Sequence, residues 1–379
     1  MGVYVHIPFC EQKCHYCDFH SVVVSDQDRL SVTGSYLVSL HKEARYWSSV
    51  WGGEALFALF VGGGTPTVLP AEELADLIAF LRTELPFVDD PEITIEANPH
   101  SLTYMGARLL RQAGVNRVSL GVQAFQDHLL RGIGRIHSAE QARESVQTLK
   151  KAGLTNINLD LMFGLPGQTS HEWADTLRQT VALGPSHISC YSLILEEGTP
   201  MEKWVREGLV HVPGDDQQAE MYALACKMLT KAGYEHYEIS NFSEPGFSCR
   251  HNLLYWHNKP FIGLGTGATG YVQQCRYTNT TDIQEYLRTW GEGPPAFRWS
   301  EQVSRDQEMD ETMMVGMRLL GGVDEAAFRA RYQVSFRDLY SDAIEELMKR
   351  GLVQFSAGSL QVTQRGLFLE NQVSLAFLR

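Results

Sequence analysis

The sequence predicts an α/β fold in which repeated βα units build a parallel, TIM-like sheet, followed by a small α+β extension and a C-terminal winged-helix-like module. Three observations support this fold class. Short β-branched and apolar runs alternate with longer helical stretches, polar or glycine residues follow the ends of successive runs, and the pattern changes near Gln302 to helices followed by a hairpin. The expected domains are therefore residues 1–210, 211–300 and 301–379.

The alternation predicts six βα units, each with one strand in the parallel sheet. The predicted strands are Val3 to Ile7, Leu56 to Val61, Glu92 to Glu96, Arg117 to Gly121, Asn156 to Asp160 and His187 to Leu193. Several of the intervening helices end in a residue followed by glycine, which suits the left-handed conformation at a helix C-terminus. These pairs are Ala113-Gly114, Ala152-Gly153 and Leu183-Gly184, and Ala232-Gly233 repeats the signal later.

Polar and glycine residues gather where these strands end. A cysteine loop follows the first strand, and Gly62 to Pro66 follow the second. The third, fourth and fifth strands end at or near Glu96 with Asn98, Gln123, and Asp160. Because the carboxyl ends of parallel strands form one rim of a barrel, where active sites are built, we expect these residues to share a site.

The C-terminal part of the sequence reads as helices and a hairpin. The hairpin strands are Leu352 to Phe355 and Leu360 to Thr363, joined by Ser356-Ala357-Gly358. Winged-helix-like modules often bind DNA, but this one is rich in carboxylates, so a packing or docking role is expected. Its acidic residues include Asp310, Glu311, Asp324, Glu325, Asp342, Glu345 and Glu346.

The composition is that of a globular protein without a nucleic-acid partner. The net charge of −13 and the lack of a basic run disfavour binding to phosphate backbones. No apolar run reaches the roughly 18 residues that a membrane span needs, and the N-terminus lacks the features of a signal peptide. Seven cysteines in such a chain favour reduced thiols or metal ligation over disulfides. A cytoplasmic location is therefore expected.

Three cysteines form a compact metal-binding pattern. Cys10, Cys14 and Cys17 lie within eight residues directly after the first strand. Three thiolates from one short loop can hold three irons of a cubane and leave the fourth iron open to another ligand. A zinc site, with a fourth ligand from His6, His15 or His20, is the alternative that these residues leave open.

This Cys-x3-Cys-x2-Cys spacing resembles the signature of the radical S-adenosylmethionine family, and Tyr16 matches its aromatic residue. The resemblance implies an open, partial (βα)6 barrel, a [4Fe-4S] cluster on the three cysteines, and S-adenosylmethionine bound to the open iron. The Gly62-Gly63-Gly64-Thr65 run fits a backbone that must approach the methionine moiety closely. It lacks the lysine of a P-loop, so phosphate binding is the poorer interpretation.

The resemblance narrows to the coproporphyrinogen III dehydrogenase-like branch and covers nearly the whole chain. It is carried by Tyr4 to Cys10, Gly62 to Thr67, Ile95 to Pro99, Gly121 to Phe125, Gly134 to His137 and Asn158 to Pro166. In that branch, the matching residues would contact S-adenosylmethionine: Tyr4, Tyr16, Gly63, Gly64, Thr65, Glu96, Gln123, Arg135 and Asp160. A carboxylate suits ribose hydroxyls or an amino group, and a guanidinium suits a carboxylate.

Two features separate this chain from the dehydrogenase itself. First, the motif of that enzyme resembles Cys-x3-Cys-x2-Cys-x-Cys, and Phe19 occupies the position of its fourth cysteine here. Second, the chain begins only three residues before Tyr4, without the N-terminal extension of that enzyme. Both disfavour decarboxylase activity, so whether the protein is an enzyme stays open.

The segment His251 to Trp256, HNLLYW, resembles instead the HNxxYW motif of the HemW heme chaperones of this branch. The heme-binding residues that the resemblance implies are His251, Asn252, Tyr255 and Trp256. An imidazole can be an axial iron ligand, and aromatic rings can pack on a porphyrin. Cys249 is a second candidate ligand, and Arg250 or Lys259 are candidates for the propionates. A buried histidine surrounded by core aromatics is the alternative structural interpretation.

We therefore expect a heme chaperone that carries a [4Fe-4S] cluster, binds S-adenosylmethionine and delivers heme to an acceptor. The alternative is a radical enzyme that decarboxylates or methylates a tetrapyrrole-type substrate. The partners implied are heme, an acceptor protein, a reduced donor such as a flavodoxin or ferredoxin, membrane contact made through an acceptor, and a second copy of the chain in a homodimer. The sequence names neither the acceptor nor the donor.

Overall fold

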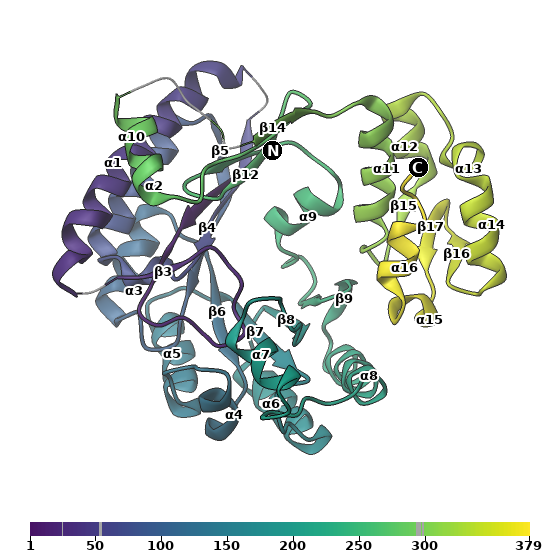
Figure 1. Cartoon of the computed structure of the whole chain (residues 1–379), viewed down its shortest axis with the longest axis horizontal. Helices are drawn as coiled ribbons and strands as arrows, with labels where there is room; N and C mark the ends of the chain where they lie inside the picture. The colour runs from purple at the N-terminus through teal and green to yellow at the C-terminus, as the bar shows by residue number, and fades with distance from the viewer. Residues whose placement is uncertain (25, 53–54, 293–296, 298) are drawn as a thin grey trace.

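The computed structural model describes residues 1–24, 26–52, 55–292, 297 and 299–379 (Figure 1). Its centre is a twelve-stranded sheet with the order β14-β13-β12-β11-β1-β4-β5-β6-β7-β8-β10-β9. Six adjacent strands are parallel: β1 (Gly2–Ile7), β4 (Leu56–Gly63), β5 (Phe87–Ala97), β6 (Arg117–Gln123), β7 (Asn156–Phe163) and β8 (His187–Ser192). They are the six predicted strands in the predicted order.

The sheet stays open and does not close into a full barrel, which agrees with the partial barrel that the resemblance implied. Instead of pairing with each other, β1 pairs with β11 (Phe261–Leu264) and β8 pairs with β10 (Asn241–Ser243). The stretch expected as an α+β extension thus adds strands to both edges of the sheet. The remaining edge strands are β9 (Glu235–Glu238), β12 (Thr269–Val272), β13 (Cys275–Thr278) and β14 (Trp299–Gln302). Residues 293–296 and 298 of that stretch lie outside the described residues.

Amphipathic helices cover the outer face of the parallel strands (Figure 1). Helix α5, for example, buries Ala139, Ala142, Val146 and Leu149 at helical spacing and begins with a Ser138 capping box. The predicted glycines Gly114, Gly153, Gly184 and Gly233 all have positive φ angles. The helices up to the sheet's end are α1 (Asp26–Trp51), η1 (Pro66–Val68), α2 (Ala71–Glu84), α3 (Tyr104–Ala113), α4 (Asp127–Gly132), α5 (Ala139–Lys151), α6 (Ser170–Leu183), α7 (Pro200–Arg206), α8 (Asp215–Lys231), α9 (Arg250–Trp256) and α10 (Ile283–Glu292).

The C-terminal module has its own hydrophobic core, which includes Met313, Phe328, Phe336 and Leu360. Its predicted hairpin is present as β16 (Val353–Ser356) and β17 (Ser359–Val362), which join β15 (Val323–Asp324) in a small sheet. Its helices are α11 (Arg305–Gly316), α12 (Glu325–Tyr332), α13 (Phe336–Leu339), α14 (Ser341–Lys349), α15 (Gln364–Leu367) and α16 (Glu370–Leu375). Figure 1 shows the module on the far side of α9 from the sheet.

Helix α9 lies at the amino ends of the parallel strands. The Glu92 carboxylate, near the start of the parallel part of β5, accepts hydrogen bonds from the backbone N–H groups of Arg250 and His251, each at 3.1 Å. A carboxylate at a helix N-terminus satisfies donors that the helix cannot pair. A Cβ on Gly2, at the start of β1, would lie 2.4 Å from a Leu254 methyl group, so α9 approaches β1 closely.

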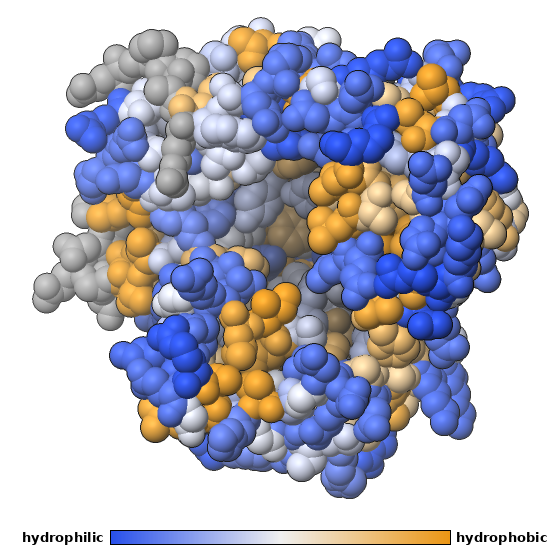
Figure 2. All heavy atoms as spheres, turned by 45° about the vertical axis from the view of Figure 1, so that its right-hand side comes forward, coloured by the Kyte–Doolittle hydropathy of each residue, from blue (hydrophilic) through white to orange (hydrophobic). Residues whose placement is uncertain are grey.

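One face of the molecule is hollowed near its centre, and hydrophobic residues border the hollow within an otherwise mostly polar surface (Figure 2). Among the described residues, no helix combines the length and hydropathy needed to cross a membrane.

Candidate functional site

A cavity of about 370 Å³ opens at the carboxyl ends of the parallel strands. It brings together eleven of the residues singled out from the sequence: Cys10, Cys14, Tyr16, Cys17, Gly63, Gly64, Thr65, Glu96, Gln123, Arg135 and Asp160. The polar residues expected at the strand ends therefore line one shared cavity. Only the parallel arrangement of the strands makes neighbours of residues so distant in the chain.

The cysteine loop is held against the barrel by a short sheet. Strand β2 (Phe9–Cys10) pairs with β3 (Val22–Val23), so both ends of the loop are fixed. The Cys10 Sγ atom lies 3.8 Å from the Thr65 Oγ1 atom, and Arg135 Nη1 donates to Cys14 Sγ at 3.5 Å. Burial raises the pKa of the Cys10 thiol, and it raises that of Cys17 to about 11.

These thiols fit an iron–sulfur cluster. All three are free and line the same cavity. Within the ranges that the structure describes, no three His, Cys, Asp or Glu side chains are grouped to hold a single metal ion. A cubane takes each thiolate on a different iron, so its ligands need not converge on one point.

The second strand ends in a tight approach to the cysteine loop. A Cβ on Gly64 would lie 2.6 Å from the Phe9 carbonyl oxygen. Any other residue would clash there, so the position requires glycine. The Gly63 N–H donates to Glu96 Oε2 at 3.1 Å. Burial, with repulsion from Asp160, raises the pKa of Glu96 to about 8, and the Gly63 hydrogen bond opposes that rise. The glycine turn thus leaves room in the cavity and anchors one of its carboxyl groups.

Arg135 and Gln123 shape the floor of the cavity. Arg135 Nη2 donates to Asn98 Oδ1 at 2.8 Å and also to the Gly121 carbonyl oxygen, while Asn98 Nδ2 donates to Thr65 Oγ1 at 3.0 Å. Gln123 sits at an irregularity of β6 with a φ of 67°, which is uncommon for a residue with a side chain. Such strained positions persist where the surrounding structure fixes them, often at functional sites.

Asp160 is fixed by hydrogen bonds from both sides. Ser119 Oγ donates to its Oδ2 at 2.8 Å, and Asn158 Nδ2 donates to its Oδ1 at 2.9 Å. Sequence reasoning missed Ser119, which lies mid-strand, and also Tyr191, which lines the cavity from the end of the sixth strand. The strand-end rule would have found Tyr191 had it been applied to that strand.

Tyr4 is the one predicted S-adenosylmethionine residue that does not line this cavity. It lies farther down the barrel, where its hydroxyl is 3.0 Å from His6 Nδ1 and its ring centre is 6.4 Å from that of His251. The histidines considered for zinc are not among the lining residues either. His6 approaches the His20 carbonyl oxygen at 2.8 Å, and the His15 ring packs edge-on against Trp204.

The HNLLYW residues form α9, at the other end of the barrel from the cysteines. His251 is buried, and its Nε2 atom lies 2.8 Å from the Tyr255 hydroxyl oxygen. Burial, with the positive charge of Arg117, lowers the pKa of His251 to about 3. Cys249 is fully buried, with its Sγ 3.5 Å from Glu92 Oε1. Asn252 and Trp256 are only partly buried.

Two protein-family models match parts of this chain. Residues 4–180 match the radical SAM superfamily, and residues 303–369 match the HemN C-terminal domain. Membership of that superfamily implies a [4Fe-4S] cluster and S-adenosylmethionine as cofactors. The solved structure of coproporphyrinogen III oxidase (HemN) from Escherichia coli, a radical SAM enzyme, is similar with a TM-score of 0.85 over 99% of this chain and 89% of that one. At 24% identity, that likeness shows the fold alone.

Curated relatives match the chain from end to end. The heme chaperone HemW of Bacillus subtilis is 37% identical over 100% of this chain and 99% of its own length. The heme chaperone HemW of Lactococcus lactis is 38% identical, covering 100% and 97%, and that of Escherichia coli is 33% identical, covering 99% and 97%. The cysteine cavity, the HNLLYW helix and these full-length matches agree: the chain belongs to the HemW family of radical SAM proteins.

Proposed function

We propose that this protein is a heme chaperone, which binds heme, carries a [4Fe-4S] cluster with S-adenosylmethionine, and transfers heme to an acceptor protein. The observation that carries the proposal is that one barrel holds two separate features. The cysteine cavity lies at the carboxyl ends of the strands, and α9 with its HNLLYW residues lies at the amino ends. The relatives that match over full length are named heme chaperones.

Cys10, Cys14 and Cys17 would hold the cluster, which would bind S-adenosylmethionine and supply the electron for its reductive chemistry. The chain's own groups would orient the cofactor. Arg135 lines the cavity and its guanidinium suits the cofactor's carboxylate, while Glu96 and Asp160 suit its ribose hydroxyls or amino group. Gly63, Gly64 and Thr65 would line its methionine part, and Tyr16 and Gln123 complete the set that we assign.

A radical enzyme acting on a porphyrinogen is the second candidate. One side chain argues against decarboxylation of the dehydrogenase type. Phe19 occupies the position of the fourth cysteine in the dehydrogenase-like motif. It lines the cysteine cavity and is 63% exposed. An apolar ring cannot replace a thiolate as a metal ligand or as a hydrogen-bonding group.

The remaining partners of the proposal follow from the chemistry. The cluster needs a reductant, such as a reduced flavodoxin or ferredoxin. All seven cysteines are free in the structure, which suits a reducing compartment, so we place the protein in the cytoplasm. We propose that the protein contacts a membrane only through an acceptor protein. We also propose that two copies of the chain form a homodimer.

The test is an anaerobic comparison of two activities in the same reconstituted protein. Heme is titrated while its absorption spectrum is followed, and coproporphyrinogen III turnover is assayed in parallel with S-adenosylmethionine and a reductant. The proposal expects about one heme bound per chain and no porphyrinogen turnover. Turnover without specific heme uptake would refute it and support the radical enzyme.

A further inference from the structure

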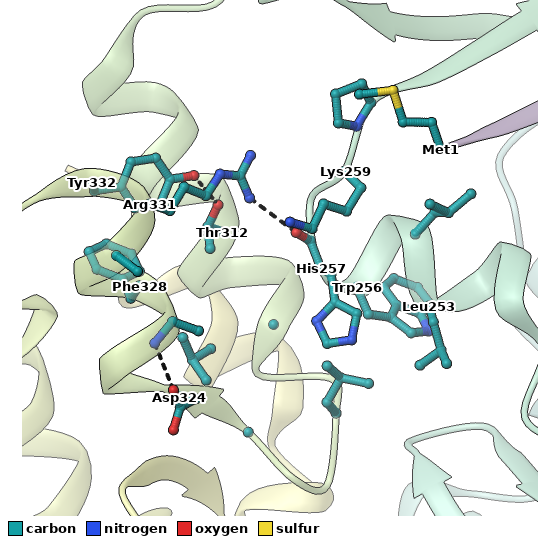
Figure 3. Close-up of a pocket in the computed structure, with 18 of the residues that line it drawn as sticks. Met1, Leu253, Trp256, His257, Lys259, Thr312, Asp324, Phe328, Arg331 and Tyr332 are labelled. Atoms are coloured by element: carbon teal, nitrogen blue, oxygen red, sulfur yellow. Dashed lines mark hydrogen bonds between the residues drawn. The ribbon is translucent and has the colours of Figure 1, made fainter. Parts of the chain in front are cut away.

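A second pocket lies between α9 and the C-terminal module, with a volume of about 980 Å³. That volume is at the upper end of the range for sites that take drug-sized or cofactor-sized ligands. One wall comes from α9 and the residues that follow it, and the other from α11 and α12 (Figure 3). Most of the lining is apolar and includes Leu253, Trp256, Pro260, Val323, Ala327 and Phe328. A wide, mostly apolar gap between two walls suits a flat, mostly apolar molecule.

His257 is the histidine that lines this pocket. It directly follows α9, and its side chain is exposed, unlike that of His251 at the other end of the helix. Figure 3 shows the imidazole below the His257 backbone, in the space between Trp256 and the residues of the opposite wall. In the part of the chain that the structure describes, its ring nitrogens make no hydrogen bond, although its carbonyl oxygen accepts one from Arg331 at 3.1 Å. A ring nitrogen without a partner is free to bind iron.

The charged groups give the pocket a direction. Lys259 and Arg331 lie toward one end, and Asp324 lies toward the other (Figure 3). Arg250 also lines the pocket, and its Nη1 donates to the Asp90 carbonyl oxygen at 3.3 Å. Arg331 is occupied by the carbonyl oxygens of His257 and Asn258 and by Glu308. Asp324 caps α12 by accepting the Ala327 N–H at 2.7 Å. An anionic group is therefore favoured near Lys259 and repelled from the end that holds Asp324.

The buried His251 is poorly placed to bind heme without rearrangement. It is 1% exposed, its Nε2 is engaged with Tyr255, and its ring packs 5.2 Å from the Phe60 ring. Its neighbours on α9, Leu253, Leu254 and Trp256, line the pocket. His251 would then be a positioning residue, which holds α9 in the barrel so that the helix can present its other face to the pocket.

Resting on the heme-binding function proposed above, we infer that heme is held in the pocket between α9 and α12, with the His257 imidazole on its iron and the Lys259 ammonium beside its propionates. Met1 and Phe57, at the amino ends of β1 and β4, line this pocket, whereas the cysteines lie beyond the opposite ends of the strands. A strand of six residues is about 20 Å long. A ligand at that separation would be out of reach of direct attack by a radical formed at the cluster, so this pocket suits cargo rather than substrate.

The experiment titrates the anaerobically reconstituted full-length protein with heme and with metal-free protoporphyrin IX, following absorption and fluorescence. His257→Ala is compared with His211→Ala, because His211 is also exposed but does not line the pocket. We expect His257→Ala to weaken heme binding at least tenfold and to shift the Soret band, while leaving metal-free porphyrin binding nearly unchanged. Lys259→Glu should weaken both ligands severalfold without shifting the band.

A pocket-filling pair tests the location without touching a ligand group. Ala327 and Ala326 are both exposed on α12, but only Ala327 lines the pocket. Ala327→Trp should abolish binding of both porphyrins, and Ala326→Trp should leave it intact. Unaltered iron content and thermal unfolding would show that the variants fold.

The outcomes separate this inference from the function on which it rests. Wild-type protein that binds no heme would refute the proposed function. Wild-type binding that survives both His257→Ala and Ala327→Trp but is lost in His251→Ala would refute the pocket and leave the chaperone function standing.

Discussion

The Nε2 atom of His251 lies 2.8 Å from the Tyr255 hydroxyl oxygen, so two residues of the HNLLYW segment bond to each other across one turn of α9. The other ring nitrogen of His251, Nδ1, is buried without a hydrogen-bond partner in the described structure. The Tyr255 ring packs edge-on against the Phe261 ring of β11. The segment therefore has a structural task, which is to hold α9 between the sheet and the C-terminal module.

Replacing Tyr255 by Phe should destabilise the fold. The change leaves the buried His251 ring without its remaining partner, and an unsatisfied buried polar group costs about 1–3 kcal/mol. Urea unfolding measures this loss. Tyr104→Phe is the control because Tyr104 is exposed, and it should unfold like the wild type. Equal stability of the two variants would show that the His251–Tyr255 contact contributes nothing.

Removing one cluster thiol should abolish the cluster. In Cys14→Ala, two protein thiolates remain for the cubane, and the Arg135 contact to sulfur is lost as well. Anaerobic reconstitution followed by iron analysis and absorption near 400 nm reads out the result. Cys275→Ala removes a thiol outside the cavity and should retain the wild-type iron content. A fully loaded Cys14→Ala protein would contradict the assignment.

The Gly64 position should tolerate no Cβ. In Gly64→Ala the new carbon would meet the backbone oxygens of Phe9 at 2.6 Å and Ile7 at 3.0 Å, so β1 or the cysteine loop must shift. We expect a loss of about 1–3 kcal/mol of stability, as for overpacked sites, and weaker S-adenosylmethionine binding. Gly132→Ala has open space around it and serves as the control. Thermal unfolding and equilibrium dialysis compare the two variants.

A buried carboxyl group should make stability fall with rising pH. Burial raises the pKa of Glu43 to about 7, partly opposed by hydrogen bonds from Tyr286, Asn279 and Gly265. The phenols of Tyr36 and Tyr277 also face it. In the fold the carboxyl group keeps its proton at pH values where the unfolded chain has lost it, so its contribution is full below about pH 4.5 and is lost toward pH 7.

In Glu43→Gln the slope of unfolding free energy between pH 5 and 7 should therefore be shallower than in the wild type, whatever the change in absolute stability. Urea unfolding across that pH range measures the slope. Glu235→Gln, at an exposed position, is the control and should keep the wild-type slope. Identical slopes for Glu43→Gln and the wild type would show that Glu43 does not titrate in this range.

The six parallel strands were predictable because local β-branched runs and glycine helix ends mark them. The strand-end rule then assembled Glu96, Gln123 and Asp160 into one site, since topology alone makes neighbours of such residues. The edge strands were harder to predict. The chain leaves the sheet at β10 and rejoins it at the opposite edge through β11, a long-range pairing that no local pattern encodes.

The second pocket could not be predicted from sequence. His257 directly follows the HNLLYW segment, and Arg331 lies in an acidic module with no motif of its own. They meet only because the module packs against α9, where Arg331 Nη2 donates to the Asn258 carbonyl oxygen at 2.8 Å. Nor does the motif itself show that His251 is turned into the barrel, because periodicity over seven residues does not fix which face of a helix is buried.

Heme transfer tests the central claim most directly. Heme-loaded, cluster-containing protein is mixed anaerobically with an apo form of a heme protein, and the acceptor's Soret band is followed, with free heme and with Cys14→Ala protein as controls. The account predicts that about one heme per chain reaches the acceptor and that the rate differs between cluster-containing and cluster-free protein. Failure of the wild type to retain heme, together with turnover of coproporphyrinogen III, would contradict it.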